Sequence, residues 1–189
     1  MEITFITGNT KKLATATRIL DKYGIKINNI KIETPEIQAD DSEEVAKYSA
    51  KWAAEKLQKP VVVSDVGWAI PALNGFPGVY MKYAATILGN TGFLKLMEGK
   101  KDKTILFKEV LAYCEPDKEP ITVSGTVKGE IQNSAEKEEF SNWSVDSIIK
   151  LEGCKNVLSK ITMQEERDKV FAKVNTWDKL ARQLLELNN

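Results

Sequence analysis

Apolar and polar positions in the first 65 residues switch between strand-like and helix-like spacing. Residues 2–6, 25–32 and 61–65 are short runs rich in β-branched side chains, which predicts three strands. Between them, residues 11–23 carry apolar side chains at helical spacing, and a second helix follows Asp41. This strand–helix order predicts a mostly parallel α/β sheet.

The ends of both helices carry recognisable signals. Gly24 is a candidate C-cap for the first helix, and Asp41 with Glu44 three residues later forms a capping pattern for the second. The second helix is expected to bury an apolar stripe made of Val45, Tyr48, Trp52 and Leu57.

The second half of the chain has a different pattern. Residues 104–115 and 121–131 read as two long antiparallel strands joined by "PDKEP". From Gln164 to Leu187 the sequence predicts a helix, with apolar side chains at Val170, Val174, Trp177, Leu180 and Leu184. No linker or repeat divides the chain, so we expect one α/β domain over residues 1–189.

Composition narrows the functional classes. Lys and Arg total 27, as do Asp and Glu, so no overall charge favours nucleic acid or a membrane surface. No signal peptide or membrane span is expected, and Cys114 and Cys154 suit reduced thiols in a cytoplasmic protein. The absence of histidine leaves Asp, Glu, Lys and Tyr for acid–base chemistry.

The segment "TGNTKK" joins the first strand to the first helix. A helix N-terminus favours anions, Gly8 permits close approach of a phosphate, and Thr7 and Asn9 can donate hydrogen bonds. Lys11 or Lys12 can supply positive charge. The alternative is an ordinary tight turn with two solvated lysines.

Three carboxylates form a second candidate site. Asp65 ends the apolar run "VVVSD", and Glu36 and Asp40 lie in the preceding loop. Carboxylates at strand ends suit Mg²⁺, which takes oxygen ligands and shares them with phosphates. The alternatives are a helix-capping role for Asp40 and a surface position for Glu36.

The loop "LNGFPGVY" is the third candidate. Asn-Gly and Pro-Gly favour turns, and Phe76 and Tyr80 lie within the loop, close to Tyr83. Aromatic side chains on a stiff loop can stack on a base or form a dimer interface. The sequence does not choose between these uses and a plain surface loop.

Four segments stand out along the chain: "FITGNTKKL", "PEIQADD", "VSDVGWAIPALNGFPGVYMKY" and "FLKLMEG". In this order and spacing they resemble the Ham1 family of inosine triphosphate pyrophosphatases. The resemblance covers roughly the first 100 residues well and "SGTVKGEI" more loosely. It implies a mixed, strongly twisted sheet flanked by helices, and Mg²⁺-dependent hydrolysis of noncanonical purine nucleoside triphosphates to monophosphate and pyrophosphate. It also implies a homodimer.

The same resemblance implies residue roles. The phosphate would be bound by Thr7, Gly8, Asn9 and Lys12, and Lys12 would also be catalytic. The metal would be bound by Glu36 and Asp65. Asp65 would also activate the attacking water. The remaining substrate-binding positions implied are Phe76, Trp143, Arg167 and Lys173.

Several family positions differ in this chain. Ala14 stands where the family usually has a glutamate, and Val66 stands where it usually has a serine. Ala172 stands where a histidine is usual, and Ser144 stands where an aspartate is usual, unless Asp146 takes that place. The later changes affect elements that recognise the base. Two alternatives therefore stay open: a nucleotide-binding or scaffold homologue without turnover, and a phosphohydrolase with altered base specificity.

Overall fold

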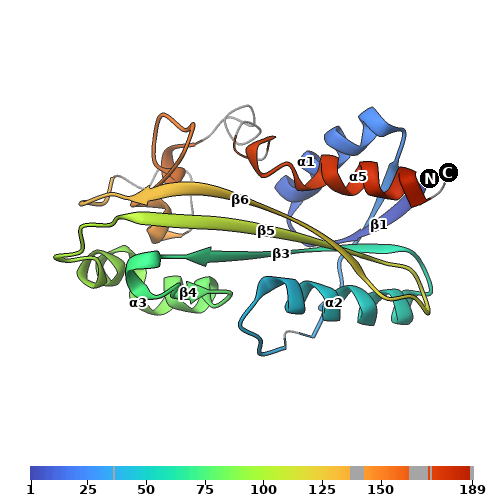
Figure 1. Ribbon diagram of the computed structural model, residues 1–189, viewed down its shortest axis with the longest axis horizontal. Helices are drawn as coiled ribbons and strands as arrows, with labels where there is room; N and C mark the ends of the chain where they lie inside the picture. Colours follow the sequence, from blue (N-terminus) through green and yellow to red (C-terminus); the bar gives the residue numbers. More distant parts are fainter. Residues whose placement is uncertain (36, 137–142, 162–169, 171, 188–189) are drawn as a thin grey trace. The chain divides into compact units, whose positions relative to one another are not determined.

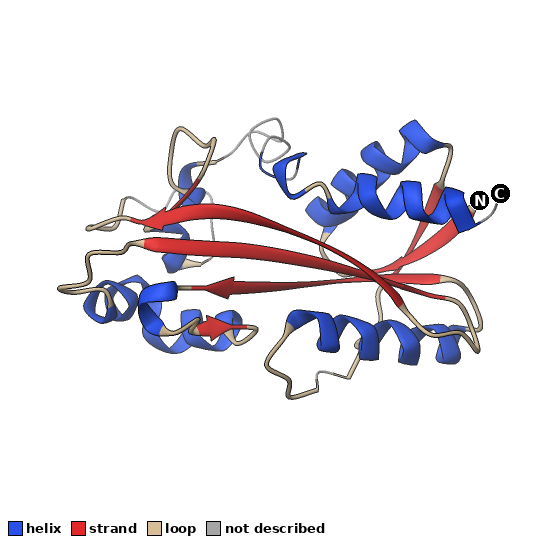
Figure 2. Cartoon of the chain, in the orientation of Figure 1, coloured by secondary structure: helices blue, strands red, loops and turns tan. Residues whose placement is uncertain are grey.

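The computed structural model describes residues 1–35, 37–136, 143–161, 170 and 172–187. It confirms the α/β fold, a mixed sheet flanked by helices (Figures 1 and 2). Among the described residues the sheet has seven strands in the order β2-β1-β3-β5-β6-β7, with β4 paired to β3. The strands are β1 (Glu2–Ile6), β2 (Lys26–Ile30), β3 (Val61–Ala69), β4 (Pro77–Gly78), β5 (Thr104–Cys114), β6 (Ile121–Ile131) and β7 (Ile149–Leu151).

The described α-helices are α1 (Thr10–Leu20), α2 (Ser42–Leu57), α3 (Met81–Leu96) and α5 (Thr176–Leu187). Short 3-10 turns are η1 (Asp21–Tyr23), η2 (Pro71–Leu73), η3 (Ser144–Ser147) and η4 (Leu158–Lys160). None of the described helices combines the length and the apolar character needed to cross a membrane.

The chain divides into two compact units. Unit 1 comprises Met1–Asp65, Glu109–Gly125 and Asn175–Asn189, and unit 2 comprises Val66–Lys108 and Thr126–Val174. Strands β3, β5 and β6 contribute residues to both units. The interpretation as one domain over residues 1–189 stays a prediction.

Unit 1 has the predicted parallel arrangement. Strand β1 pairs in parallel with β2 and with β3, and Gly24 ends the first helical segment with a positive φ of 67°, as expected for a C-cap. Figure 1 shows α1 beside α5. Buried side chains of β1, β3 and β5 alternate between a core with α1 and α5 and a core with α2.

The stripe predicted for α2 is correct only in part, because Trp52 and Leu57 are partly buried against the core. Asp41 does cap the helix, accepting a hydrogen bond from the Glu43 N–H at 3.0 Å, but Tyr48 is exposed. The buried positions of α2 are small: Ser42, Ala46, Ser49, Ala50, Ala53 and Ala54. Small side chains let the helix axis lie close to the sheet, so packing distance overrides the apolar stripe read from the sequence.

The predicted helix from Gln164 to Leu187 is interrupted. Residues 172–174 are helical, Asn175 has a positive φ of 55°, and α5 then begins at Thr176. Asparagine tolerates this conformation better than most residues. All five predicted apolar positions are buried, but they serve different cores: Val170 and Val174 in unit 2, and Trp177, Leu180 and Leu184 in unit 1.

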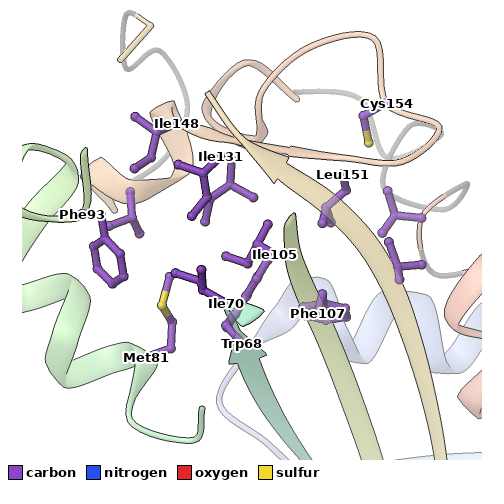
Figure 3. Close-up of a cluster of buried hydrophobic side chains, with 14 of the residues drawn as sticks. Trp68, Ile70, Met81, Phe93, Ile105, Phe107, Ile131, Ile148, Leu151 and Cys154 are labelled. Carbon is purple, nitrogen blue, oxygen red and sulfur yellow. The ribbon is translucent and has the colours of Figure 1, made fainter. Parts of the chain in front are cut away.

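Unit 2 is built around its own apolar core. Figure 3 shows side chains from β3, β5, β6 and α3 gathered there. The Trp68 and Phe107 rings pack edge to face, with 4.8 Å between their centroids. Helix α3 is broken at Gly89, whose φ of 58° and ψ of −172° are not helical. The backbone N–H of Asn90 then donates to the Ser144 hydroxyl at 3.1 Å.

Gly129 of β6 lies where β7 approaches closely. A methyl group at Gly129 would lie 2.7 Å from the Lys150 carbonyl oxygen and 2.8 Å from Leu151 Cδ2, so Gly129→Ala must move backbone. We expect it to lower the free energy of unfolding by about 1–3 kcal/mol, measured by thermal or urea unfolding. The exposed neighbour offers the control Lys128→Ala, expected within about 0.5 kcal/mol of the parent. Equal stability of the two variants would contradict the expected clash.

Candidate active site

The loop between β1 and α1 is held by its own side chains. Asn9 is the N-cap of α1, and its Oδ1 accepts hydrogen bonds from the backbone N–H groups of Lys11 at 3.0 Å and Lys12 at 3.2 Å. The Asn9 N–H donates to the Thr7 hydroxyl at 3.0 Å. A phosphate at this helix end would compete with Asn9 for two donors, so the charge of Lys12 carries more of the expected attraction.

Strand β2 supports the same loop. The Asn29 amide donates to the carbonyl oxygens of Phe5 at 3.0 Å and Thr7 at 2.9 Å. The aliphatic part of Lys31 runs beside Gly8: a methyl group added to Gly8 would lie 3.2 Å from Lys31 Cε. Lys31 therefore brings a second basic side chain to this loop, one that the sequence analysis did not identify.

The sequence suggested that Asp65 ends its strand, but in the structure it does not. Strand β3 continues to Ala69, and the strand that ends here is its neighbour β1, whose last residue, Ile6, is in register with Val63. After Ile6 the chain leaves β1 and enters the loop at Thr7. Ser64 and Asp65 therefore follow directly after the part of β3 that pairs with β1. The polar residues interrupt β3 where its β1 neighbour stops, which is why an apolar strand tolerates them there.

Four side chains on the α1/α5 face form a continuous hydrogen-bonded chain. The Lys12 ammonium donates to Ser64 Oγ at 3.1 Å, and the Ser64 hydroxyl donates to Glu109 Oε1 at 3.2 Å. The Thr176 hydroxyl donates to Glu109 Oε2 at 2.5 Å. Glu109 and Thr176 are each 1% exposed. Four elements, α1, β3, β5 and α5, thus contribute to one polar cluster within unit 1.

Two opposing effects act on the Lys12 ammonium. Burial lowers the pKa of Lys12 below its ordinary value, and the nearby carboxylates of Glu109 and Asp65 raise it in part.

Asp65 lies on the other face of β3 from Ser64, because successive side chains of a strand alternate. Its Oδ2 atom is shielded from solvent. No group of three or more metal-ligating side chains is found among the described residues, and Glu36, the other expected ligand, lies outside them. Asp40 is exposed in the loop before α2.

The remaining predicted substrate-binding residues that the structure describes belong to unit 2. Phe76 is 41% exposed and its ring stacks against Phe93 at 6.4 Å between centroids, and Trp143 is 40% exposed just before η3. The Lys173 ammonium lies 3.3 Å from a carboxylate oxygen of Glu152. Arg167 lies outside the described residues.

Sequence patterns alone did not single out Ser64, Glu109 or Thr176 as site residues. Glu109 had a usable signal: it is a single acid within the apolar strand "ILFKEVLAYC", the same feature that drew attention to Asp65. Thr176 had none, because its contact depends on where α5 begins after Asn175.

Known proteins share this fold. The structure of the Staphylococcus aureus Ham1 protein superposes with a TM-score of 0.76, covers 100% of both chains and is 22% identical in sequence.

The family assignment rests on sequence. The family model described as the Ham1 family matches residues 3–183. A dITP/XTP pyrophosphatase of Methanopyrus kandleri is 38% identical over 184 residues, covering 95% of this chain and 97% of that protein. A dITP/XTP pyrophosphatase of Methanosarcina acetivorans is 42% identical over 152 residues, covering 80% and 82%. The chain belongs to the Ham1 family.

Proposed function

We propose that this chain hydrolyses noncanonical purine nucleoside triphosphates, of the dITP and XTP class, to nucleoside monophosphate and pyrophosphate. Its family and the pyrophosphatase names of its relatives support this activity. The structural observation that carries the proposal is the hydrogen bond from Lys12 to Ser64. It joins the loop expected to bind phosphate to the strand segment that bears Asp65.

The β1–α1 loop binds the triphosphate in this proposal. Thr7, Gly8 and Asn9 form the loop at the start of α1, where the helix dipole favours negative charge. Lys12 supplies a full positive charge to phosphate oxygens. Lys31, beside Gly8, adds a second cation from β2's end.

We also propose Mg²⁺ as the cofactor, held by Asp65 and Glu36. Carboxylate oxygens are suitable ligands for this ion. The Asp65 carboxylate would repel a polyphosphate, and a divalent cation held by it would offset that repulsion. When bound, the metal would neutralise charge on the phosphate oxygens.

Asp65 has a second role in this proposal. Its carboxylate would accept the proton of the water that attacks the α-phosphorus, breaking the bond to the departing pyrophosphate. Lys12 would stabilise negative charge on the phosphate oxygens as that bond breaks.

The remaining substrate contacts in this proposal come from Phe76, Trp143, Arg167 and Lys173, with Arg167 in the place of a phosphate-contacting lysine. One observation suggests that discrimination between bases is weaker here than in relatives with the usual motifs. The Lys173 ammonium is paired with Glu152. A site with fewer available donors separates similar bases less strongly.

The function is tested by measuring pyrophosphate release with Mg²⁺ from ITP, XTP, dITP, the four common ribonucleotides and their deoxy forms. We expect ITP, XTP and dITP to be preferred by at least about tenfold in kcat/KM. Release of orthophosphate instead of pyrophosphate would contradict the proposed bond cleavage. Nucleotide binding without any turnover would favour the scaffold alternative.

We further propose a homodimer located in the cytoplasm. In unit 2, Tyr83 and Ile87 lie one turn apart on α3 and are 65% and 76% exposed, and Phe76 and Tyr80 are also exposed nearby in sequence. An exposed apolar face of this kind favours a protein contact. Light scattering after size exclusion would test it: the double variant Tyr83→Lys/Ile87→Lys should be monomeric, and an unchanged mass would reject this face.

A further inference from the structure

The hydrogen bonds around Glu109 have only one possible direction. An ammonium only donates and a carboxylate only accepts, so Ser64 must accept from Lys12 and donate to Glu109. Thr176 likewise must donate to the second carboxylate oxygen. The Ser64 hydroxyl is therefore oriented by Glu109, with its lone pair toward Lys12.

Glu109 is itself fixed from two sides. Its carboxylate is buried on β5, and Thr176 approaches it from the first residue of α5. The next residue, Trp177, packs edge to face on Phe5 of β1 at 4.9 Å between ring centroids, which anchors the start of α5 on the sheet. The carboxylate thus has a rigid surrounding.

Lys12 needs such an anchor. Its ammonium sits at the end of a flexible four-carbon side chain, so its position is not fixed by the backbone. Burial of the ammonium also opposes its charged form. A hydroxyl alone is a weak acceptor for a buried ammonium, whereas a hydroxyl polarised by a carboxylate behind it is a stronger one.

We propose that Glu109 is a positioning residue for Lys12: its carboxylate orients the Ser64 hydroxyl, which holds the Lys12 ammonium at a fixed place beside the β1–α1 loop. The purpose of this arrangement, which is to present Lys12 to the triphosphate, rests on the proposed function. The hydrogen-bonded chain itself is independent of that function. Glu109 acts through Ser64 and is not itself expected to touch substrate.

The first test needs no substrate. The side-chain ammonium signal of Lys12 is recorded by ¹⁵N NMR in the full chain and assigned by its loss in Lys12→Arg. We expect Glu109→Gln to shift or abolish this signal, and Glu109→Asp, which keeps the charge, to retain it. Val110→Ala is the matched control, because Val110 is the next residue of β5, is buried and faces the other core. An unchanged signal in Glu109→Gln would overturn the proposal.

A second variant covers the case in which Glu109→Gln fails to fold. Ser64→Ala removes the bridging hydroxyl and keeps the carboxylate, and it should also displace the Lys12 ammonium signal. If the signal stayed in place in Ser64→Ala, the proposed bridge would be wrong.

Kinetics then separate positioning from stability. With the best nucleotide of the panel, Glu109→Gln should lower kcat/KM by about tenfold to a hundredfold, and Glu109→Asp should recover most of it. Equal losses in Glu109→Gln and Val110→Ala would overturn the positioning role. If no nucleotide is hydrolysed but Glu109→Gln still displaces the ammonium signal, the proposed function fails and the positioning of Lys12 stands.

Discussion

Asp65→Asn should reduce kcat for pyrophosphate release by roughly a thousandfold, within the range that a general base contributes. The amide has nearly the shape of the carboxylate but cannot accept the proton of the attacking water, and it is a poorer ligand for Mg²⁺. Steady-state kinetics at saturating Mg²⁺ and nucleotide would measure the change.

The matched control for this variant is Asp40→Asn. Asp40 is an exposed carboxylate in the loop before α2 and is one of the three carboxylates that the sequence offers as metal ligands. We expect it to change kcat by less than about threefold, as for a surface substitution away from the reaction. If Asp65→Asn kept full activity, Asp65 would be neither the base nor an essential metal ligand.

Lys12→Met should impair both activity and folding. The variant removes the cation proposed to stabilise the phosphate oxygens, so kcat/KM should fall by about a hundredfold or more. It also leaves the Glu109 carboxylate buried without its positive partner. The free energy of unfolding should therefore fall by about 2–3 kcal/mol, measured by urea unfolding.

A double-mutant cycle separates the two effects. Lys12→Met combined with Glu109→Gln removes both charges, so stability should recover by about 1–2 kcal/mol relative to Lys12→Met alone. Activity should not recover, because the cation is still missing. Strictly additive stability changes would show that Lys12 and Glu109 do not interact in the folded protein.

Local signals in the sequence were sufficient for the first part of the fold. The order of strands and helices up to Asp65 predicted the parallel pairing of β1 with β2 and β3. The residues Gly24 and Asp41 marked helix ends correctly. Caps and alternation depend on neighbours within a few residues, so one sequence carries enough information to place them.

Errors arose where packing between distant segments decided the outcome. The face that α2 buries is set by how closely the helix approaches the sheet, which favoured Ala50 over Tyr48. The helix break at Asn175 lies where the buried stripe passes from one core to another. Neither property is visible in the apolar spacing of the helix itself.

The sequence by itself determined the α/β class and the loop at Gly8 and Lys12 between a strand and a helix, because each is a local pattern of residue types; the same kind of pattern predicts a role for Asp65. Only the tertiary structure decided that Asp65 lies within β3 beside the end of β1. It alone also joined Lys12 to Glu109 through Ser64. Lys12 and Ser64 are 52 residues apart in the chain, and Ser64 and Glu109 are 45 residues apart. Strand register and helix docking depend on the whole core, and they bring these side chains within hydrogen-bond distance.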